Sequence, residues 1–255
     1  MSLRTPIITT RDLGVVYDRG TAAETMALYG ANIEIYPEEY VIFFGPSGCG
    51  KSTLLYALAG IDKEFTGEIT IDSNNLHLMT SDELAQYHRV TIGMVFQSFN
   101  LIQTLNVLDN IAFPQTLIGI DRSTRRRKAR ELLRRFGLEH VEKRLPVELS
   151  GGQQQRVAIA RAIINDPPII FADEPTGNLD SKSAAVVVEV FDQLCRGEKK
   201  TFVLVTHNPD YLNKADRVFH MRDAHIEFVE EVARDANGNR MEPTVGHGET
   251  EYILK

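Results

Sequence analysis

The chain has 255 residues, of which 43% are hydrophobic and 25% charged, a balance that is ordinary for one large globular domain or a core with an inserted subdomain. The net charge of −7 argues against a general nucleic-acid binder, and no apolar run is long enough to span a membrane. Two cysteines make no disulfide framework and the N-terminus lacks a signal-peptide core, so we expect a soluble, cytoplasmic protein.

The N-terminal part of the chain predicts short strands of two kinds. Residues 7–17 are expected to form an edge strand, and residues 31–36 and 67–72 alternate between apolar and polar side chains, as half-buried strands do. Residues 40–44 are continuously apolar, which indicates a fully buried strand. We therefore expect a small antiparallel layer beside a separate parallel core.

The rest of the chain alternates between helices and buried strands. Residues 91–96, 168–173 and 201–206 are expected to be strands, and residues 217–221 and 225–228 a closing hairpin. Residues 106–164 show a helical pattern, with a strongly basic helix at 123–136 and another at 150–164, and residues 181–195 are also helical. Strands alternating with helices predict a parallel sheet, whose ligands bind at the carboxyl ends of the strands.

A glycine-rich loop follows the first buried strand and fits the pattern G-x-x-x-x-G-K-[ST]. In this pattern the backbone amides and the following helix N-terminus bind phosphate, Lys51 reaches the β- and γ-phosphates, and the Ser52 hydroxyl ligates Mg²⁺. The alternative is a plain glycine turn between a strand and a helix. The candidate nucleotide-binding residues of this loop are Gly45, Pro46, Ser47, Gly48, Cys49, Gly50, Lys51, Ser52 and Thr53. Cys49 is either an oxidation-sensitive thiol or a small residue that fills a tolerant position.

Two acids end the buried strand at residues 168–173. Asp173 suits a carboxylate that holds Mg²⁺, directly or through water, and Glu174 suits a base that polarises water for attack on the γ-phosphate. The alternative is a pair of acids that only begins a loop, since strand ends often carry acids.

A second anion-binding helix start is indicated at residues 149–156, Leu-Ser-Gly-Gly-Gln-Gln-Gln-Arg. Ser150 is a good N-cap, and Gly151 and Gly152 expose the amides of the first turn. The alternative is an ordinary capped helix in an inserted subdomain.

Together these motifs resemble those of the ATP-binding cassette (ABC) ATPases, over roughly residues 7–228. Residues 45–52 match the Walker A motif, 169–174 the Walker B motif and 149–156 the signature sequence. Gln97 matches the Q-loop, residues 178–180 the D-loop and His207 the switch histidine. The segments Glu-Pro-Thr-Gly-Asn-Leu-Asp, Ser-Gly-Gly-Gln-Gln-Gln-Arg and Phe-Gln-Ser-Phe-Asn-Leu resemble the LolD/MacB/FtsE-like branch of ABC transporter ATP-binding proteins.

The resemblance implies an α/β fold of the P-loop NTPase class. Its RecA-like parallel sheet core would carry an antiparallel β subdomain and an inserted α-helical subdomain at about residues 98–164. The cassette would span residues 1–229, and residues 230–255 would form a C-terminal extension, either a hairpin or disordered. The histidine and acids near residue 247 do not make a metal site.

The resemblance also implies the roles of residues outside the phosphate loop. Two cassettes would pair head to tail, with ATP between one phosphate loop and the partner's signature helix. Across that interface the contacts would come from the signature residues Ser150, Gly151, Gly152 and Gln153 and from the D-loop residue Asp180. Gln97 would sense Mg²⁺ and the attacking water, and His207 would hold the γ-phosphate. Tyr17 would stack on adenine; its competitors are Tyr36, which precedes a turn, and Tyr29, expected to pack.

The function implied is that of a Mg²⁺-dependent ATPase that works as a dimer, with a homodimer expected. It would drive a separate membrane permease in export, lipoprotein release or mechanotransmission, from the inner face of the cell membrane and without nucleic acid. The alternative is a soluble cassette acting on DNA or ribosomes. The basic helix is either a phospholipid or acidic-partner surface or, more simply, a solvated face. Residues 97–114, with Phe99, Leu101, Leu105 and Phe113, would line a groove for a partner helix, although some of these must be core.

Overall fold

A six-stranded sheet forms the centre of the molecule in the computed structural model, which describes residues 5–232. The strand order is β10-β9-β3-β8-β7-β6, and every neighbouring pair is parallel except β9 with β10. The strands are β3 (Tyr40–Phe44), β6 (Ile92–Val95), β7 (Ile169–Asp173), β8 (Thr201–Thr206), β9 (Arg217–Arg222) and β10 (His225–Glu231). The carboxyl ends of the parallel strands therefore meet at one edge, where the candidate catalytic residues follow them.

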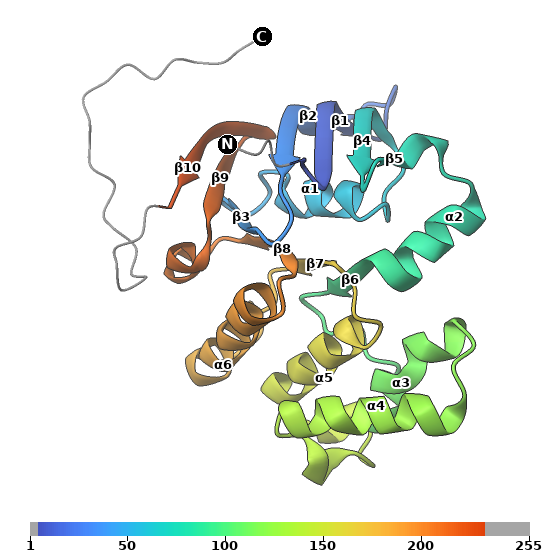
Figure 1. Cartoon of the computed structure of the whole chain (residues 1–255). Coiled ribbons are helices and arrows are strands. Elements are labelled where there is room, and N and C mark those ends of the chain that lie inside the picture. Colours follow the sequence, from blue (N-terminus) through green and yellow to red (C-terminus); the bar gives the residue numbers. More distant parts are fainter. Residues whose placement is uncertain (1–4, 233–255) are drawn as a thin grey trace.

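A second, antiparallel sheet covers one side of this core (Figure 1) and has the order β2-β1-β4-β5. Its strands are β1 (Ile8–Tyr17), β2 (Thr25–Ile35), β4 (Phe65–Ile71) and β5 (Asn74–Asn75). The expectation that β1 is an edge strand is wrong, because β1 pairs with β2 on one side and β4 on the other. Its apolar side chains Ile8, Leu13 and Val15 are fully buried, so the sequence predicted the strand but not its central position in the sheet.

Helix α1 (Lys51–Leu58) lies between the two sheets. Leu54, Leu55 and Leu58 are fully buried in one core with side chains of the antiparallel sheet and with Val41 and Phe43 of β3. Because successive strand residues point to opposite faces, the alternate residues of β3 belong to the other core. The helix that begins at the phosphate loop is thus packed on both sides.

On the other face of the central sheet lie α5 (Gly151–Ile163) and α6 (Ser181–Asp192), and α3 (Val107–Leu117) and α4 (Arg122–Arg135) pack against α5, farther from the strands (Figure 1). A short helix that the sequence analysis did not predict, α2 (Ser81–Gln86), precedes β6 and begins with a capping box between Thr80 and Glu83. None of the described helices combines the length and the apolarity needed to cross a bilayer.

The basic helix α4 pairs several of its charges within the chain. Arg126 makes a bidentate contact with Asp109 at 2.8 and 2.9 Å, and Arg130 and Arg135 pair with acids of other segments. These contacts favour the solvated-face interpretation over a phospholipid surface. The predicted extension at residues 230–255 lies almost entirely outside the described residues, as does the histidine near residue 247.

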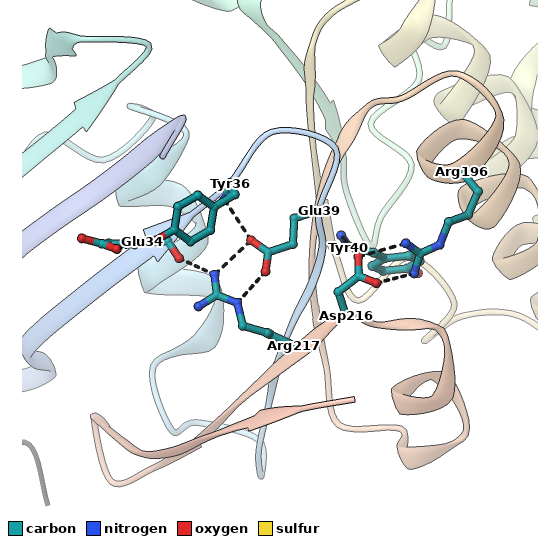
Figure 2. A network of polar contacts seen from close by, with 7 residues as sticks. All are labelled: Glu34, Tyr36, Glu39, Tyr40, Arg196, Asp216 and Arg217. Atoms are coloured by element: carbon teal, nitrogen blue, oxygen red, sulfur yellow. Dashed lines mark hydrogen bonds and ion pairs between the residues drawn. The ribbon is translucent and has the colours of Figure 1, made fainter. Parts of the chain in front are cut away.

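Arg217 at the start of β9 fixes the turn between β2 and β3 (Figure 2). Its guanidinium donates to both carboxylate oxygens of Glu39, at 2.5 and 2.9 Å, and to the backbone carbonyl of Glu34. Glu39 also accepts the backbone N–H of Tyr36, whose ring lies 5.6 Å from the guanidinium. The closing hairpin is therefore attached to the turn that leads into the phosphate-loop strand.

Asp216, the preceding residue, makes a second connection in the same region (Figure 2). Its carboxylate accepts the backbone N–H of Tyr40 at 2.9 Å and two bonds from Arg196, at 2.7 and 3.0 Å. Together these contacts hold the start of β3 in position relative to β9, and hence fix where the phosphate loop begins.

Candidate active site

The phosphate loop joins β3 to α1 in a backbone conformation that requires glycine. Gly50, the N-cap of α1, has φ 100°, and a Cβ there would lie 2.2 Å from the carbonyl oxygen of Ala27. A Cβ on Gly45 would lie 2.2 Å from the carbonyl oxygen of Met221. No side chain caps α1, so the amides of its first turn are free to bind an anion.

Lys51 places a nearly buried ammonium group at the mouth of this loop. Its side chain is 4% exposed, and Nζ donates to the carbonyl oxygens of Gly45 at 3.0 Å and Pro46 at 2.9 Å. The Nζ atom also lies 3.8 Å from Oε1 of Glu174. A cation held by neutral carbonyls beside free amides is suited to an anionic ligand such as a phosphate.

Asp173, the last residue of β7, is 5% exposed and has donors on both carboxylate oxygens. The Ser52 hydroxyl donates to Oδ1 at 2.8 Å, and the Tyr56 hydroxyl donates to Oδ2 at 2.5 Å. Burial, followed by the bond to Asp173, raises the pKa of Tyr56, which therefore stays a donor at neutral pH. The sequence analysis missed Tyr56; the available signal was its spacing of four residues from Ser52, which puts both on one helix face.

Glu174 follows in a left-handed backbone conformation, with φ 39°. Its N–H is held by the carbonyl of Val205 at 3.0 Å, which directs the side chain across the edge of the sheet. Oε2 contacts Nδ1 of His207 at 2.9 Å, and Glu174 is 14% exposed while His207 is 52% exposed. The two predicted catalytic residues are thus in contact, at the ends of adjacent strands and beside Lys51.

Gln97 follows β6 and is exposed, and its contacts are with the loop after β7 rather than with Asp173. Its side-chain amide nitrogen lies 3.0 Å from where a Cβ of Gly177 would be. Its backbone carbonyl accepts a hydrogen bond from the side-chain amide of Asn178 at 3.1 Å. A role of Gln97 at the metal therefore stays a prediction.

The segment after Gln97 is attached to α5 by Arg161, a residue that the sequence analysis did not single out. Its guanidinium donates to the carbonyls of Phe99 at 2.9 Å and Asn100 at 2.6 Å. Both of those residues have left-handed backbones, with φ 59° and 50°. The sequence carries no signal for this contact, because one arginine among many on helices does not indicate which carbonyls it will meet.

The second anion-type helix start, at α5, lies beside α6. Ser150 and Gln153 form a capping box, in which each side chain accepts the other's backbone N–H. A Cβ on Gly152 would lie 2.6 Å from the hydroxyl oxygen of Ser183 in α6. Asp180 caps α6, and hydrogen bonds from Ser183 lower the pKa of the Asp180 carboxyl. The neighbours of this helix start thus come from the D-loop region and not from the phosphate loop.

Tyr17 ends β1 next to α1. Its hydroxyl donates to Asp62 at 3.0 Å and lies 3.4 Å from the hydroxyl of Thr53, and burial is the largest cause of its raised pKa. The expectation that Tyr29 packs inside is wrong, because its side chain is 58% exposed. Tyr36 lies in the Arg217 network (Figure 2), where the guanidinium is 5.6 Å from its ring. Adenine stacking by Tyr17 stays a prediction.

Cys49 is 4% exposed, and its sulfur lies 2.9 Å from where a Cβ of Gly45 would be. Burial raises the pKa of the thiol, which opposes formation of the reactive thiolate. Both observations favour the small space-filling residue over the oxidation-sensitive thiol.

The donor set fits a nucleotide with Mg²⁺. Ser52 and Asp173 offer a hydroxyl and a carboxylate, the hard oxygen ligands that Mg²⁺ prefers, and Mg²⁺ characteristically takes one or two carboxylates together with substrate phosphates. Within residues 5–232 no group of three or more His, Cys, Asp and Glu residues is arranged to hold a metal without such help.

A groove of about 330 Å³ lies between β6, α3 and α5. Phe113, 37% exposed, lines it, whereas Leu101 is 7% exposed and belongs to the core. Arg161 lies in its wall, so the groove and the segment after Gln97 share a residue. Its other lining residues are His88, Arg89, Ile92, Gly93, Met94, Phe96, Asn100, Ile102, Pro114, Ala162 and Asn165.

The chain is similar to known ATP-binding cassettes. The ABC transporter family matches residues 28–177. An ABC transporter ATP-binding protein of Thermotoga maritima is 43% identical over 86% of this chain and 93% of that protein. The lipoprotein-releasing system ATP-binding protein LolD 2 of Caulobacter vibrioides is 36% identical over 88% of this chain and 97% of that protein.

The solved structures agree with these relatives. The bacterial ABC transporter cassette MJ0796, solved as a dimer, superposes with a TM-score of 0.82 at 38% identity, over 88% of this chain and 98% of that one. A second structure of MJ0796, with the same score, identity and coverage, is a dimeric post-hydrolysis state bound to ADP and phosphate. The chain therefore belongs to the ABC transporter ATP-binding family, as an ATPase with the predicted P-loop NTPase fold and a likeness to the LolD branch.

Proposed function

We propose that this ABC transporter ATP-binding protein binds ATP with Mg²⁺, closes as a head-to-tail dimer and so drives a separate membrane permease. The observation that carries the proposal is the presence of two anion-ready helix starts with different neighbours. The start of α1 lies with Lys51, Asp173 and Glu174, whereas the start of α5 lies with α6. Each helix start would then supply half of a site, and a second copy would supply the other half.

The residues around the phosphate loop divide the chemistry between them. The amides of α1 and Lys51 would bind the β- and γ-phosphates, and Ser52 and Asp173 would hold Mg²⁺, which supplies charge neutralisation on the phosphate oxygens. Glu174 would accept the proton of the attacking water. His207 would donate a hydrogen bond to the γ-phosphate.

The contacts present without nucleotide support this assignment. Oε2 of Glu174 lies 2.9 Å from Nδ1 of His207 and Oε1 lies 3.8 Å from Nζ of Lys51, so this carboxylate lies between the two groups. A γ-phosphate would compete for the same two groups and free Glu174 to face water. The exchange makes ATP binding and the activation of Glu174 a single event.

Across the dimer, Ser150, Gly151 and Gly152 would contact the partner's γ-phosphate, and Asp180 would contact the partner's phosphate loop. Ser150 and Asp180 are exposed and Gly151 is partly exposed, at the starts of the neighbouring helices α5 and α6, whereas Gly152 is buried against α6. A homodimer is the expected form, since one chain carries both halves. The MJ0796 cassette, at 38% identity, is dimeric by its description.

The groove lined by Phe113 is the expected contact with the permease. Its aromatic and apolar lining, next to Arg161 and the segment after Gln97, would allow an inserted helix to respond to the nucleotide. This contact would hold the protein at the inner face of the membrane. The relatives are named for ABC transport and lipoprotein release, which favours a transporter subunit over a cassette acting on DNA or ribosomes.

The first test replaces the proposed base. Glu174→Gln removes the proton acceptor but keeps the size of the side chain, so hydrolysis should fall at least about 100-fold while ATP still binds. The variant should then elute as a dimer with ATP and as a monomer with ADP. Hydrolysis near the wild-type rate would contradict the assignment of Glu174, and a monomer in ATP would contradict the shared site.

The second test concerns the permease. Phe113→Asp places a charge in the groove, and Leu117→Asp is the matched control, because Leu117 is 54% exposed on the same helix but outside the groove lining. In detergent-solubilised membranes of the native host, the wild type and the control should co-purify with one multispan protein, and Phe113→Asp should not. Recovery of the wild type on ribosomes or DNA instead would support the alternative.

A further inference from the structure

One helix holds both oxygens of the acid at the end of β7. Ser52 and Tyr56 are four residues apart in α1, so their side chains lie one above the other on the same face. Ser52 bonds Oδ1 of Asp173 at 2.8 Å and Tyr56 bonds Oδ2 at 2.5 Å. The carboxylate is therefore held by two hydrogen bonds from a helix that is itself packed between two sheets.

The two bonds have different consequences for a cation. A serine that donates its proton to Oδ1 keeps its oxygen lone pairs free, and these are what a divalent cation binds. That arrangement requires Oδ1 to face Ser52, which depends on the rotation of the carboxylate. The bond from Tyr56 to Oδ2 opposes such rotation, because turning the group would break both bonds.

Burial makes the Tyr56 bond consequential. Asp173 is only 5% exposed, so solvent offers little replacement for a lost donor. A short O–H···O⁻ bond is also among the stronger hydrogen bonds in proteins. Without the Tyr56 hydroxyl, Ser52 would be the remaining side-chain donor, and Oδ2 would compete with Oδ1 for its hydrogen bond.

We propose that Tyr56 is a positioning residue, which fixes the Asp173 carboxylate so that Ser52 presents its oxygen to the divalent cation of the bound nucleotide. The inference rests on the proposed Mg²⁺ site of Ser52 and Asp173 and adds to it a residue outside the phosphate-loop motif. Tyr56 acts through Asp173 and touches neither the phosphates nor the reacting water.

The test measures how much Mg²⁺ strengthens nucleotide binding. A non-hydrolysable ATP analogue is titrated into the full chain by calorimetry, once with saturating Mg²⁺ and once with EDTA. Loss of an outer hydrogen bond to a ligating group characteristically weakens metal affinity about 10–100-fold. Tyr56→Phe should therefore lose about 10-fold in affinity with Mg²⁺ and keep its affinity in EDTA.

Hydrolysis gives an independent readout. In Tyr56→Phe the Mg²⁺ concentration at half-maximal rate should rise by a similar factor, whereas the rate at saturating Mg²⁺ should recover most of its wild-type value. Tyr36→Phe is the control, since Tyr36 also donates to a carboxylate, that of Glu34, at 2.7 Å, but in an exposed bond outside the site. This control should match the wild type in every measurement.

Ser52→Ala tests the Mg²⁺ site separately from the positioning role of Tyr56. If the Mg²⁺ site is correct, Ser52→Ala loses the gain that Mg²⁺ gives the wild type. Should Tyr56→Phe then keep the full gain, or lose equally with Mg²⁺ and with EDTA, the positioning role of Tyr56 is wrong while the metal site stands. A wild type that gains nothing from Mg²⁺ would instead overturn the metal site itself.

Discussion

Asn110, in the first turn of α3, should contribute more to stability than any exposed asparagine of the described residues. Its side chain is fully buried and makes four bonds to the segment that precedes the helix. The side-chain oxygen accepts the N–H of Ile102 at 2.8 Å, and the amide donates to the carbonyls of Ile102, Leu105 and Asn106 at 3.0, 2.8 and 3.2 Å. We predict that Asn110→Ala lowers the free energy of unfolding substantially.

The magnitude follows from the partners left behind. The carbonyls of Asn106 and Ile102 keep their bonds to the backbone N–H groups of Asn110 and Leu105, so two backbone groups, the Ile102 N–H and the Leu105 carbonyl, lose a partner. At about 1–1.5 kcal/mol each, less about 0.6 kcal/mol for the better helix propensity of alanine, the loss is about 1.5–2.5 kcal/mol. Thermal denaturation should show a fall of about 2–4 °C for each kcal/mol.

Asn32→Ala is the matched control. Asn32 also accepts a backbone N–H, that of Asp12, and donates to a backbone carbonyl, that of Gly30, but it is exposed. Water can replace both bonds, so this variant should lose less than about 1 kcal/mol. Equal losses in the two variants would contradict this prediction, because burial would then not determine the cost of the missing partner.

Three further predictions concern the loop, the hairpin and the buried thiol. Gly50→Ala should abolish ATP binding, measured by calorimetry, whereas Gly20→Ala, with a similar backbone angle but open space around it, should only lose stability. Arg217→Ala should lower the unfolding free energy by about 2 kcal/mol in urea, and the control Arg222→Ala, whose side chain is 64% exposed, by less than about 0.5 kcal/mol. Because burial raises the pKa of Cys49, its alkylation by iodoacetamide should be slower at neutral pH than that of a free thiol and should accelerate as pH rises; a fast reaction at neutral pH would contradict this.

The parallel core was predictable because its signals are local. The strands predicted at residues 40–44, 168–173 and 201–206 have apolar interiors, and they lead into the phosphate loop, Glu174 and His207, respectively, at the edge where ligands bind. The contacts among Lys51, Glu174 and His207 follow from that arrangement once the strands are adjacent. Motif spacing fixed the identity of these residues, and strand order brought them together.

What the sequence could not predict depends on neighbours in space. The apolar residues of β1 indicate a strand, but its place between β2 and β4 depends on partners distant in the sequence, such as Ile71, which lies opposite Ile8. Tyr29 resembles a core aromatic by type and is exposed, because it lies on the face of β2 opposite the buried Leu28, where its ring contacts that of His225. Tyr56 and Arg161 are ordinary helix residues in the sequence, and they gain significance only from the Asp173 carboxylate and the carbonyls that they meet.

The segment after Gln97 shows how the site and the groove are connected. One end is held by Asn178, from the loop that follows Asp173 and Glu174. Farther along, Arg161 of α5 holds the carbonyls of Phe99 and Asn100, and it also lines the groove. Because neither end is free, a displacement of the loop after β7 by nucleotide must move the groove wall, strain the left-handed residues between, or break one of these bonds. Of these three responses, movement of the groove wall keeps every bond. It is therefore the least costly way for ATP binding to affect a partner in the groove.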